Sequence, residues 1–409
     1  MGRKHHAGPL SGIRIFDMTR ILAGPTATQI LADLGADVIK IERPGTGDDV
    51  RAWGPPYLKD ESGRDQPRES VYFNAANRNK RSITLNLASP EGQALALKLI
   101  AKSDVLFENY KTGDLAKYGL AYAQLKDRFR LVYCSLTGFG QTGPYAERAG
   151  FDLVVQGMGG IMSITGPDGG EPAKVGVGIA DLMTGMYSNI AILAALRHRD
   201  ATGRGQHIDM ALLDCQVAWL INEGMNYLHT GRIPKAWGTA HATIVPYRAY
   251  PTSDGHFILA VGNDRQFRAF CTFAGEPALA DDPRFLTNAL RVANRADCDA
   301  AVTALTAKHP SDYWIEGLSK RAVPCGPVNT IDKVFANPQV KARNMVVEIP
   351  HTASGKPERY IASPIKLSET PVEYRRGAPM VGEHTEEVLG ELLGMGQDAV
   401  AKLRAGGVV

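Results

Sequence analysis

The sequence lacks the features that mark metal-binding, disulfide-rich and nucleic-acid-binding proteins. Its five cysteines lie far apart and form no Cys-x-x-Cys pair, which argues against a disulfide framework and a zinc site. Its ten histidines form no His-x-x-x-His or His-Glu-x-x-His pattern, so we expect no bound metal. Lys and Arg number 46 against 43 Asp and Glu, and the net charge of +3 gives no reason to expect a nucleic-acid partner.

Further absences concern location and hydrolytic chemistry. No apolar run approaches the length of a membrane span, so we expect no membrane partner. The N-terminal Met-Gly-Arg-Lys-His-His has no apolar stretch behind it, unlike a secretory signal. With the unpaired cysteines, this predicts a cytoplasmic protein. No Gly-x-Ser-x-Gly elbow is present, so we expect no serine-hydrolase triad.

The first half of the chain alternates strand-like and helix-like segments. A helix is indicated over residues 25–34, and another begins at Ser89-Pro90-Glu91, where proline follows a good capping residue. This order predicts an α/β fold whose large domain has a mostly parallel, Rossmann-like sheet with helices on its faces. The strand-like runs are residues 13–18, 37–42, 82–87, 105–107 and 131–135.

The second half predicts a smaller domain inserted into the large one. Two strand-like runs flank the turn Ser253-Asp254-Gly255, a hairpin signal, and helical patterns follow. We expect the large α/β domain over residues 10–229, a linker over 230–244, a small α+β domain over 245–327, and a segment returning to the large domain over 328–409.

Several loops follow the predicted strands, where ligands bind in open α/β sheets. Arg43 follows the second strand and suits paired contacts to phosphate, although a solvated surface arginine gives the same pattern. Asn77 to Arg81 adds cations that would suit a polyphosphate at one ligand mouth. Gly138 to Gly143 matches Gly-x-Gly-x-x-Gly, but Pro144 follows and no helix opens there. We expect this loop to let its backbone approach a ligand without forming a dinucleotide site.

Asp181 opens an apolar helical run that extends to Arg199 and is followed by Thr202-Gly203-Arg204-Gly205. A carboxylate at a helix start lies among unpaired N–H groups at the positive dipole end, so we expect it to stay ionised. An ionised, positioned carboxylate serves covalent acyl transfer. The same position also suits a plain N-cap aspartate. Asp152 starts another helical stretch and is by itself an ordinary first-turn carboxylate.

Several motifs occur in order along the chain. They are 10–13 (Leu-Ser-Gly-Ile), 23–25 (Ala-Gly-Pro), 34–42 (Leu-Gly-Ala-Asp-Val-Ile-Lys-Ile-Glu), 79–82 (Asn-Lys-Arg-Ser), 138–144 (Gly-Phe-Gly-Gln-Thr-Gly-Pro) and 202–205 (Thr-Gly-Arg-Gly). Together they resemble the family III CoA-transferases over about Leu10 to Met395. The resemblance implies that Asp181 is the nucleophile, that CoA thioesters are substrates without any permanently bound cofactor, and that the protein is an intertwined homodimer.

The resemblance also implies a CoA site along the loops of the large domain. The residues it places there are Ile21, Leu22 and Ala23 beside the pantetheine, Arg43 at the phosphates, Leu85 to Ala88, Asn109, Tyr110 and Lys111 at the nucleotide end, and Lys117 at a position that is often basic.

One departure separates two branches that share this fold. The α-methylacyl-CoA racemases place a histidine base before the aspartate of a Gly-His-Asp motif, and this chain has Gly150-Phe151-Asp152. Phenylalanine cannot carry a proton, so the transferase activity is favoured over the racemase activity. A CoA-binding protein without turnover is the remaining alternative, and the intact helix start at Asp181 argues against it.

The second half is similar to the succinate and glutarate branch of the transferases. This similarity implies a diacyl-CoA donor such as succinyl-CoA and a dicarboxylic acid acceptor such as glutarate. The similarity is carried by residues 238–241, 244–247, 262–264 and 323–329. The residues expected near the acyl group, its oxyanion or a second carboxylate are Gly138, Gly140, Asp152, His241, Arg248, Gly262 and Asn263, with Arg265 as a further candidate.

Overall fold

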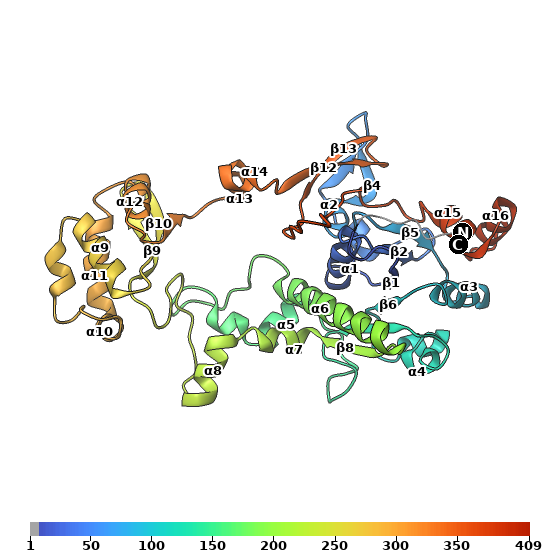
Figure 1. Ribbon diagram of the computed structural model, residues 1–409, viewed down its shortest axis with the longest axis horizontal. Coiled ribbons are helices and arrows are strands. Elements are labelled where there is room, and N and C mark those ends of the chain that lie inside the picture. Colours follow the sequence, from blue (N-terminus) through green and yellow to red (C-terminus); the bar gives the residue numbers. More distant parts are fainter. Residues whose placement is uncertain (1–7) are drawn as a thin grey trace. The chain divides into compact units, whose positions relative to one another are not determined.

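The computed structural model describes residues 8–409, and Figure 1 shows their helices and strands. The N-terminal segment considered above for a secretory signal lies outside these residues. The described chain forms two compact units. The first contains the residues up to Met162, Lys174–Arg232 and Lys341–Val409, and the second contains Ser163–Ala173 and Ile233–Val340. The second unit is broader than the expected small domain, because residues 163–173, residues 233–244 of the expected linker and residues 328–340 belong to it.

The first unit is built on a parallel sheet of six strands in the order β5-β2-β1-β6-β7-β8. The expected α/β fold with a Rossmann-like parallel sheet is confirmed. Five of these strands lie on runs that the sequence predicted, and β8 was missed although its residues alternate between polar and apolar types, a pattern typical of a strand. The bounds are β1 Arg14–Met18, β2 Asp37–Glu42, β5 Arg81–Thr84, β6 Val105–Glu108, β7 Val132–Thr137 and β8 His207–Ala211.

Helices cover both faces of this sheet because successive strand residues point to opposite sides. Ile15 packs in the apolar cluster formed with α1 (Ala23–Asp33) and α6 (Ile179–Thr202). Phe16, the next residue, packs in the cluster formed with α3 (Pro90–Ile100), α15 (Thr385–Leu393) and α16 (Gln397–Ala405). The C-terminal segment therefore completes the first unit, as Figure 1 shows by the red helices beside β5.

The remaining elements of the first unit are short. They are β3 Tyr57–Lys59, β4 Asp65–Ser70, α2 Val71–Ala75, α4 Tyr122–Leu125, α5 Asp152–Met158, α7 Leu212–Ala218, α8 Ile221–Thr230, β12 Val346–His351 and β13 Lys356–Ile361. The helix α14 (Pro338–Ala342) spans the last boundary between the two units.

Helix α6 corrects the expectation that no apolar segment approaches the length of a membrane span. It is 24 residues long, and among the described helices it alone is long and apolar enough by length and composition to cross a membrane. Half of its most apolar stretch is buried in the unit, as for the core helix of a domain. Its contact with α1 is close, since a Cβ added at Gly185 would lie 2.6 Å from the carbonyl oxygen of Ala23.

The second unit is an α+β structure around an antiparallel sheet in the order β11-β10-β9. The predicted hairpin is present as β9 and β10, paired across Ser253 and Asp254. Trp314 is 1% exposed at the centre of its apolar core. The bounds are β9 Tyr247–Thr252, β10 Gly255–Ala260, α9 Asp264–Phe273, α10 Asn288–Ala293, α11 Arg295–Thr306, α12 Ser311–Ser319, β11 Cys325–Pro327 and α13 Ile331–Ala336.

Candidate active site

The loop between β1 and α1 is held by a buried lysine. The Nζ of Lys40, on β2, donates to the carbonyl oxygen of Thr19 at 2.9 Å and to the carboxylate of Asp48 at 2.8 Å. The other oxygen of Asp48 accepts from the backbone N–H of Ile21 at 3.2 Å. Lys40 and Asp48 are both fully buried at their side chains, so little water weakens their attraction. Through this pair, β2 fixes the backbone that follows β1.

Ile21 shows that this loop is constrained. Its φ of 72° lies in the left-handed region, which a β-branched residue rarely adopts. Strained backbone of this kind persists only where surrounding contacts fix it, and it is concentrated at functional sites. The bond from Ile21 to Asp48 is one such contact.

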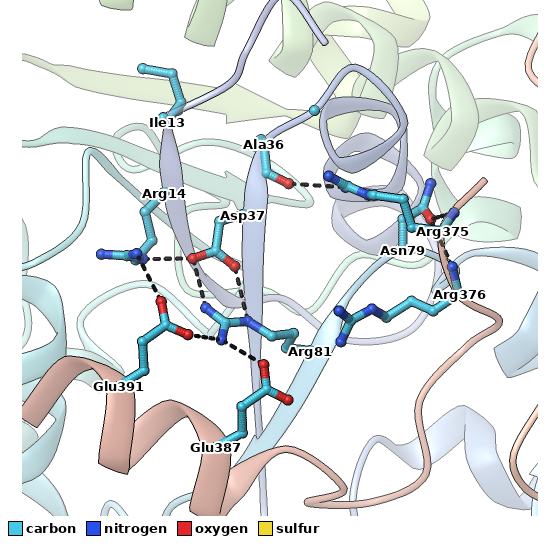
Figure 2. Close-up of a pocket in the computed structure, with 12 residues that line it drawn as sticks. Ile13, Arg14, Ala36, Asp37, Asn79, Arg81, Arg375, Arg376, Glu387 and Glu391 are labelled. Carbon is cyan, nitrogen blue, oxygen red and sulfur yellow. Dashed lines mark hydrogen bonds and ion pairs between the residues drawn. The ribbon is translucent and has the colours of Figure 1, made fainter. Parts of the chain in front are cut away.

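A second buried pair lies under the start of α1. The Nζ of Lys80 lies 3.3 Å from the carboxylate of Asp17 and donates to the carbonyl oxygen of Pro25 at 2.9 Å. Arg78 pairs with Asp33, and Arg81 pairs with Asp37, the second of which Figure 2 shows. The cations between Asn77 and Arg81 are therefore bonded inside the first unit, and none of them lines the two cavities described next, where the expected ligand mouth would lie. The sequence could not show that buried acids would pair with them.

Residues from the carboxyl ends of three strands line a cavity of about 270 Å³ with Asp181, hereafter the Asp181 cavity. Ile21, Leu22 and Ala23 follow β1. Asn109, Tyr110 and Lys111, which follow β6 and were also expected at CoA, line the same cavity. Gly138, which follows β7, lines it as well.

The other expected CoA residues line an adjoining cavity of about 500 Å³, hereafter the Arg43 cavity. It contains Arg43, Leu85 and Lys117. The Nζ of Lys117 lies 3.5 Å from the carboxylate of Asp114. Arg20 and Tyr110 line both cavities, so the two adjoin at these residues. Together they form one track that includes Asp181, and its lining holds cations such as Arg43 and Lys117 as well as acids such as Asp48 and Asp114.

Arg20 is a site residue that the sequence analysis did not single out. Its guanidinium donates to Asp49 at 3.0 Å and lies 5.1 Å from the centre of the Tyr110 ring. Arg43 pairs with the same Asp49 carboxylate, so one acid holds two arginines at the junction of the cavities. Its position directly after the first strand was the available signal, because that is where ligands bind in such sheets.

Two buried polar atoms in the Asp181 cavity have no partner in the described protein. They are the Nε of Arg20 and the Oγ1 of Thr112. A buried donor or acceptor without a partner costs free energy, and native proteins satisfy nearly all of them. Arg20 and Thr112 line this cavity, and these two atoms of their side chains are buried.

Asp181 lies in the first turn of α6, but it is not the cap of that helix. The helix begins at Ile179, and the carboxylate of Asp152, from α5, accepts from the backbone N–H of Ala180 at 2.8 Å and of Asp181 at 3.3 Å. Asp152 also accepts from the side chain of Gln156 at 2.7 Å. The capping alternative therefore applies to Asp152, and the Asp181 carboxylate remains free to face the cavity.

The expectation that the helix start keeps Asp181 fully ionised is wrong. Burial, and to a smaller extent the negative charge of Asp152, raise the pKa of Asp181 to about 7. Asp152 takes up the helix N–H groups that would otherwise stabilise the Asp181 charge. A carboxyl group with a pKa near neutrality changes its protonation state in the range where enzymes work.

The glycine loop after β7 brings its backbone close to a neighbouring segment. A Cβ added at Gly138 would lie 2.5 Å from the Cα of Gly150, so only glycine fits there. Gly140 has a φ of 88°, and its N–H already donates to the Oγ1 of Thr137 at 2.9 Å. Of the two glycines expected at an oxyanion, Gly138 lines the Asp181 cavity, and the N–H of Gly140 is engaged elsewhere.

The remaining expected substrate residues belong to the second unit. Gly262 donates its N–H to the side chain of Gln266 at 2.8 Å, and Asn263 caps α9 by accepting from the N–H of Gln266 at 3.0 Å. Arg248, on β9, lies 3.6 Å from the carboxylate of Asp299. The Nδ1 of His241 accepts from the N–H of Thr243 at 3.1 Å. Within residues 8–409, no group of three His, Cys, Asp or Glu side chains could hold a metal ion.

The fold and the site together define an α/β protein whose ligand track contains a carboxylate. The amino-acid sequence is similar to that of known enzymes over nearly its whole length. The sequence model of CoA-transferase family III matches residues 10–385 of this chain. The succinate–glutarate CoA-transferase of Agrobacterium fabrum is 50% identical over 385 residues, which cover 94% of this chain and 96% of that protein. The succinyl-CoA:glutarate CoA-transferase of Mus musculus is 42% identical, covering 98% of this chain and 90% of that protein.

A solved structure agrees with these relatives. The CAIB/BAIF family protein from Brucella suis is 48% identical and aligns with a TM-score of 0.82 over 94% of this chain and 99% of that chain. The chain therefore belongs to CoA-transferase family III. It is a CoA-transferase, an enzyme class that takes CoA thioesters as substrates.

The raised pKa of Asp181 gives a direct prediction. In the free protein, its carboxyl group should titrate with a midpoint near pH 7, and Asp152→Asn should lower that midpoint because a negative charge is removed. Carboxyl infrared difference spectra recorded against pH would measure this, with Asp181→Asn identifying the signal. Asp214→Asn, an exposed first-turn aspartate on α7, is the matched control and should leave the midpoint in place. An Asp181 midpoint near that of a free aspartate would contradict the prediction.

Proposed function

We propose that this CoA-transferase moves CoA from succinyl-CoA to glutarate or a similar dicarboxylic acid, with Asp181 as the covalent nucleophile. The observation that carries the proposal is the track of two adjoining cavities. It joins the expected CoA residues to Asp181 through Arg20 and Tyr110. The choice of acids is supported by the two relatives named for succinate or succinyl-CoA and glutarate.

CoA fits this track by charge and by shape. Its phosphates would lie in the Arg43 cavity, near Arg43 and Lys117, since guanidinium and ammonium groups bind phosphate oxygens. The pantetheine would pass Arg20 and Tyr110 and follow Ile21 to Ala23 toward Asp181. The unpaired Nε of Arg20 and Oγ1 of Thr112 would then bond its polar groups.

The reaction begins with the ionised carboxylate of Asp181. It attacks the thioester carbonyl of the donor, and the C–S bond breaks to give a mixed anhydride and CoA thiolate. The thiolate attacks the aspartyl carbonyl, which gives an aspartyl-CoA thioester and releases the donor acid with one oxygen from Asp181. The acceptor carboxylate attacks this thioester, and the returning thiolate attacks the acceptor carbonyl of the new anhydride. Acceptor-CoA leaves, and Asp181 is restored.

Asp152 and Gly138 support these steps from fixed positions. Asp152 holds the start of α6 through Ala180 and Asp181, so it sets where the nucleophile lies. The N–H of Gly138 is a candidate to stabilise an oxyanion, since its residue lines the same cavity. His241, Arg248 and Arg265 remain the candidates for the second carboxylate of the acid, with Gly262 and Asn263 beside the acyl group.

The central prediction concerns Asp181 and acceptor choice. With succinyl-CoA and a panel of mono- and dicarboxylic acids, the protein should form glutaryl-CoA, detected as a new acyl-CoA mass. Asp181→Asn should lower this rate by roughly a thousandfold or more, because the nucleophile is lost. CoA binding, measured by calorimetry, should change little, since the track is intact.

Asp214→Asn is again the control and should keep the wild-type rate, because its carboxylate is exposed on α7. Near-normal turnover by Asp181→Asn would contradict the covalent mechanism. The racemase alternative predicts uptake of solvent deuterium into 2-methylacyl-CoA with no acceptor. Phe151 argues against it, because a phenyl ring carries no proton.

Arg20 gives a prediction about CoA binding. Arg20→Leu should raise the KM for the CoA thioester by roughly 10- to 100-fold, the range for losing a hydrogen bond to a charged group. The rate at saturating substrate should fall less, since Arg20 contacts the CoA moiety and not the reacting carbonyl. Arg359→Leu, at an exposed arginine on β13, removes the same charge and should leave KM unchanged. Equal KM values for both variants would exclude a role for Arg20.

We also propose a homodimer, supported by an exposed apolar stripe on α6. Met186, Ile190 and Leu193 share one helix face and are 51%, 63% and 39% exposed. Contiguous exposed apolar surface marks interaction sites. Light scattering should give twice the chain mass of 44.1 kDa, and Ile190→Glu should shift the protein toward that single-chain mass. Ile361→Glu, at an exposed isoleucine on β13, should not. A wild-type protein of 44.1 kDa at all concentrations would contradict the dimer.

We further propose a cytoplasmic location. The five cysteines are all free thiols in the structure, and four of them are buried. Thiols persist in this state in a reducing compartment. Fractionation of the producing cells tests the proposal, and recovery of the protein from an oxidising compartment would contradict it.

A further inference from the structure

Gln156, on α5, has a buried side chain that is bonded at both ends of its amide group. Its Nε2 donates to the carboxylate of Asp152 at 2.7 Å, and its Oε1 accepts from the backbone N–H of Val175 at 2.9 Å. A carboxylate accepts hydrogen bonds and a backbone N–H donates them, so this orientation of the amide satisfies both partners. The transfer steps described above give Gln156 no part.

Asp152 is held on both of its carboxylate oxygens. Oδ1 accepts from the backbone N–H groups of Ala180 and Asp181 at 2.8 and 3.3 Å, and Oδ2 accepts from Gln156. The carboxylate therefore cannot turn without breaking one of these bonds. Because Asp152 is only partly buried, its carboxylate could turn toward water if the bond to Gln156 were lost.

The bond to Val175 fixes Gln156 to the chain that leads into α6. Only residues 176–178 separate Val175 from the start of the helix at Ile179. A Cβ added at Gly178 would lie 3.0 Å from the side chain of Leu22 and 3.6 Å from the carboxylate of Asp152. One buried amide thus joins α5, the cap of α6 and the segment before it.

The charge state of Asp181 reports on this arrangement. The negative charge of Asp152 contributes to the raised pKa of Asp181, and both acids, after burial, raise the pKa of Tyr72 on α2. A substitution at Gln156 removes none of these charges, so it can change the pKa of Asp181 only by moving its neighbours. The other charged or titratable side chains that line the Asp181 cavity are Arg20, Asp49, Tyr110, Lys111 and Arg148.

We propose that Gln156 is a positioning residue for the transfer reaction, which holds the carboxylate of Asp152 on the start of α6. This role rests on the proposed function, in which Asp181 is the nucleophile. While Asp152 is held, the N–H groups of Ala180 and Asp181 stay bonded to it, and the Asp181 carboxylate keeps its place at the cavity. Placement matters because a shift of roughly 1 Å at a reacting group can lower a rate by roughly a hundredfold.

Gln156→Met tests this role, because methionine has a similar length and makes neither bond. The midpoint of Asp181 should fall, since Asp152 turns away and the released N–H groups stabilise the ionised form of Asp181. The kcat should fall by roughly tenfold or more, as for the loss of a hydrogen bond to a charged group, with the KM for succinyl-CoA unchanged. Infrared titration of the free protein and steady-state kinetics measure the two effects.

Gln29→Met is the matched control. Gln29, on α1, is also buried and bonded at both ends, since it donates to the carbonyl oxygen of Ala75 at 3.2 Å and accepts from the N–H of Arg78 at 2.9 Å. Its substitution should destabilise the fold to a similar extent and leave the Asp181 midpoint and kcat in place. An equal shift in both variants, or no shift in Gln156→Met, would overturn the role of Gln156.

A double variant separates positioning from general destabilisation. In an Asp152→Ala background, Gln156→Met should change neither the Asp181 midpoint nor kcat further, because its route to Asp181 is already removed. Effects that simply add would contradict the proposal. The titration needs no substrate, so it tests Gln156 even if the protein does not form glutaryl-CoA, a result that would instead contradict the proposed function.

Protein labelled with heavy nitrogen in its glutamine side chains gives a test in which Gln156 is unchanged. Asp152→Ala should move one side-chain amide proton signal upfield in the magnetic resonance spectrum, because the charged acceptor is lost. Asp312→Ala, at an exposed first-turn aspartate on α12, should leave these signals in place. The same glutamine spectrum in wild type and Asp152→Ala would overturn the assignment.

Discussion

The buried pair of Lys40 and Asp48 is the interaction on which the site depends. It joins β2 to the loop after β1 through Thr19 and Ile21, and it holds Ile21 in a conformation that an isolated chain would avoid. Removing one partner would leave a buried charge uncompensated, which costs about 3–5 kcal/mol in proteins. That loop lines both the approach to Asp181 and, through Arg20, the junction with the Arg43 cavity. The position of the track therefore depends on a buried ion pair between Lys40 and Asp48, of which Asp48 also lines the Arg43 cavity.

The raised pKa of Asp181 depends on a second acid, Asp152, at the start of α6. Asp152 accepts from the N–H groups of Ala180 and Asp181, so these groups are not available to the Asp181 carboxylate. Asp181 is left half-buried beside that charge, and its pKa rises to about 7. A carboxylate less stabilised by its surroundings is a better nucleophile, while enough of it remains ionised near neutral pH. The proposed covalent transfer depends on both properties of Asp181, its nucleophilicity and its ionised fraction near neutral pH.

Sequence patterns predicted the parallel sheet well, since short apolar stretches such as residues 15–16, 38–39 and 132–134 lie within β1, β2 and β7. They also predicted which loops would line the track, because strand ends determine where ligands bind. They did not predict that Arg78, Lys80 and Arg81 would be bonded internally, because the partner acids lie far away in the sequence. For the same reason, the capping role of Asp152 required the structure, whereas the place of Arg20 just after the first strand was a signal that the sequence did offer. The second unit's candidates for the substrate carboxylate remain predictions.

A single-turnover experiment with glutarate labelled by heavy oxygen tests the covalent transfer most directly. Enzyme in excess over succinyl-CoA would be mixed with labelled glutarate, and both the released succinate and the Asp181 peptide would be weighed by mass spectrometry. The covalent route predicts label in Asp181 and unlabelled succinate, because the first succinate takes its new oxygen from the enzyme. Labelled succinate with unlabelled Asp181 would mean that glutarate attacks the donor directly, which would contradict the account.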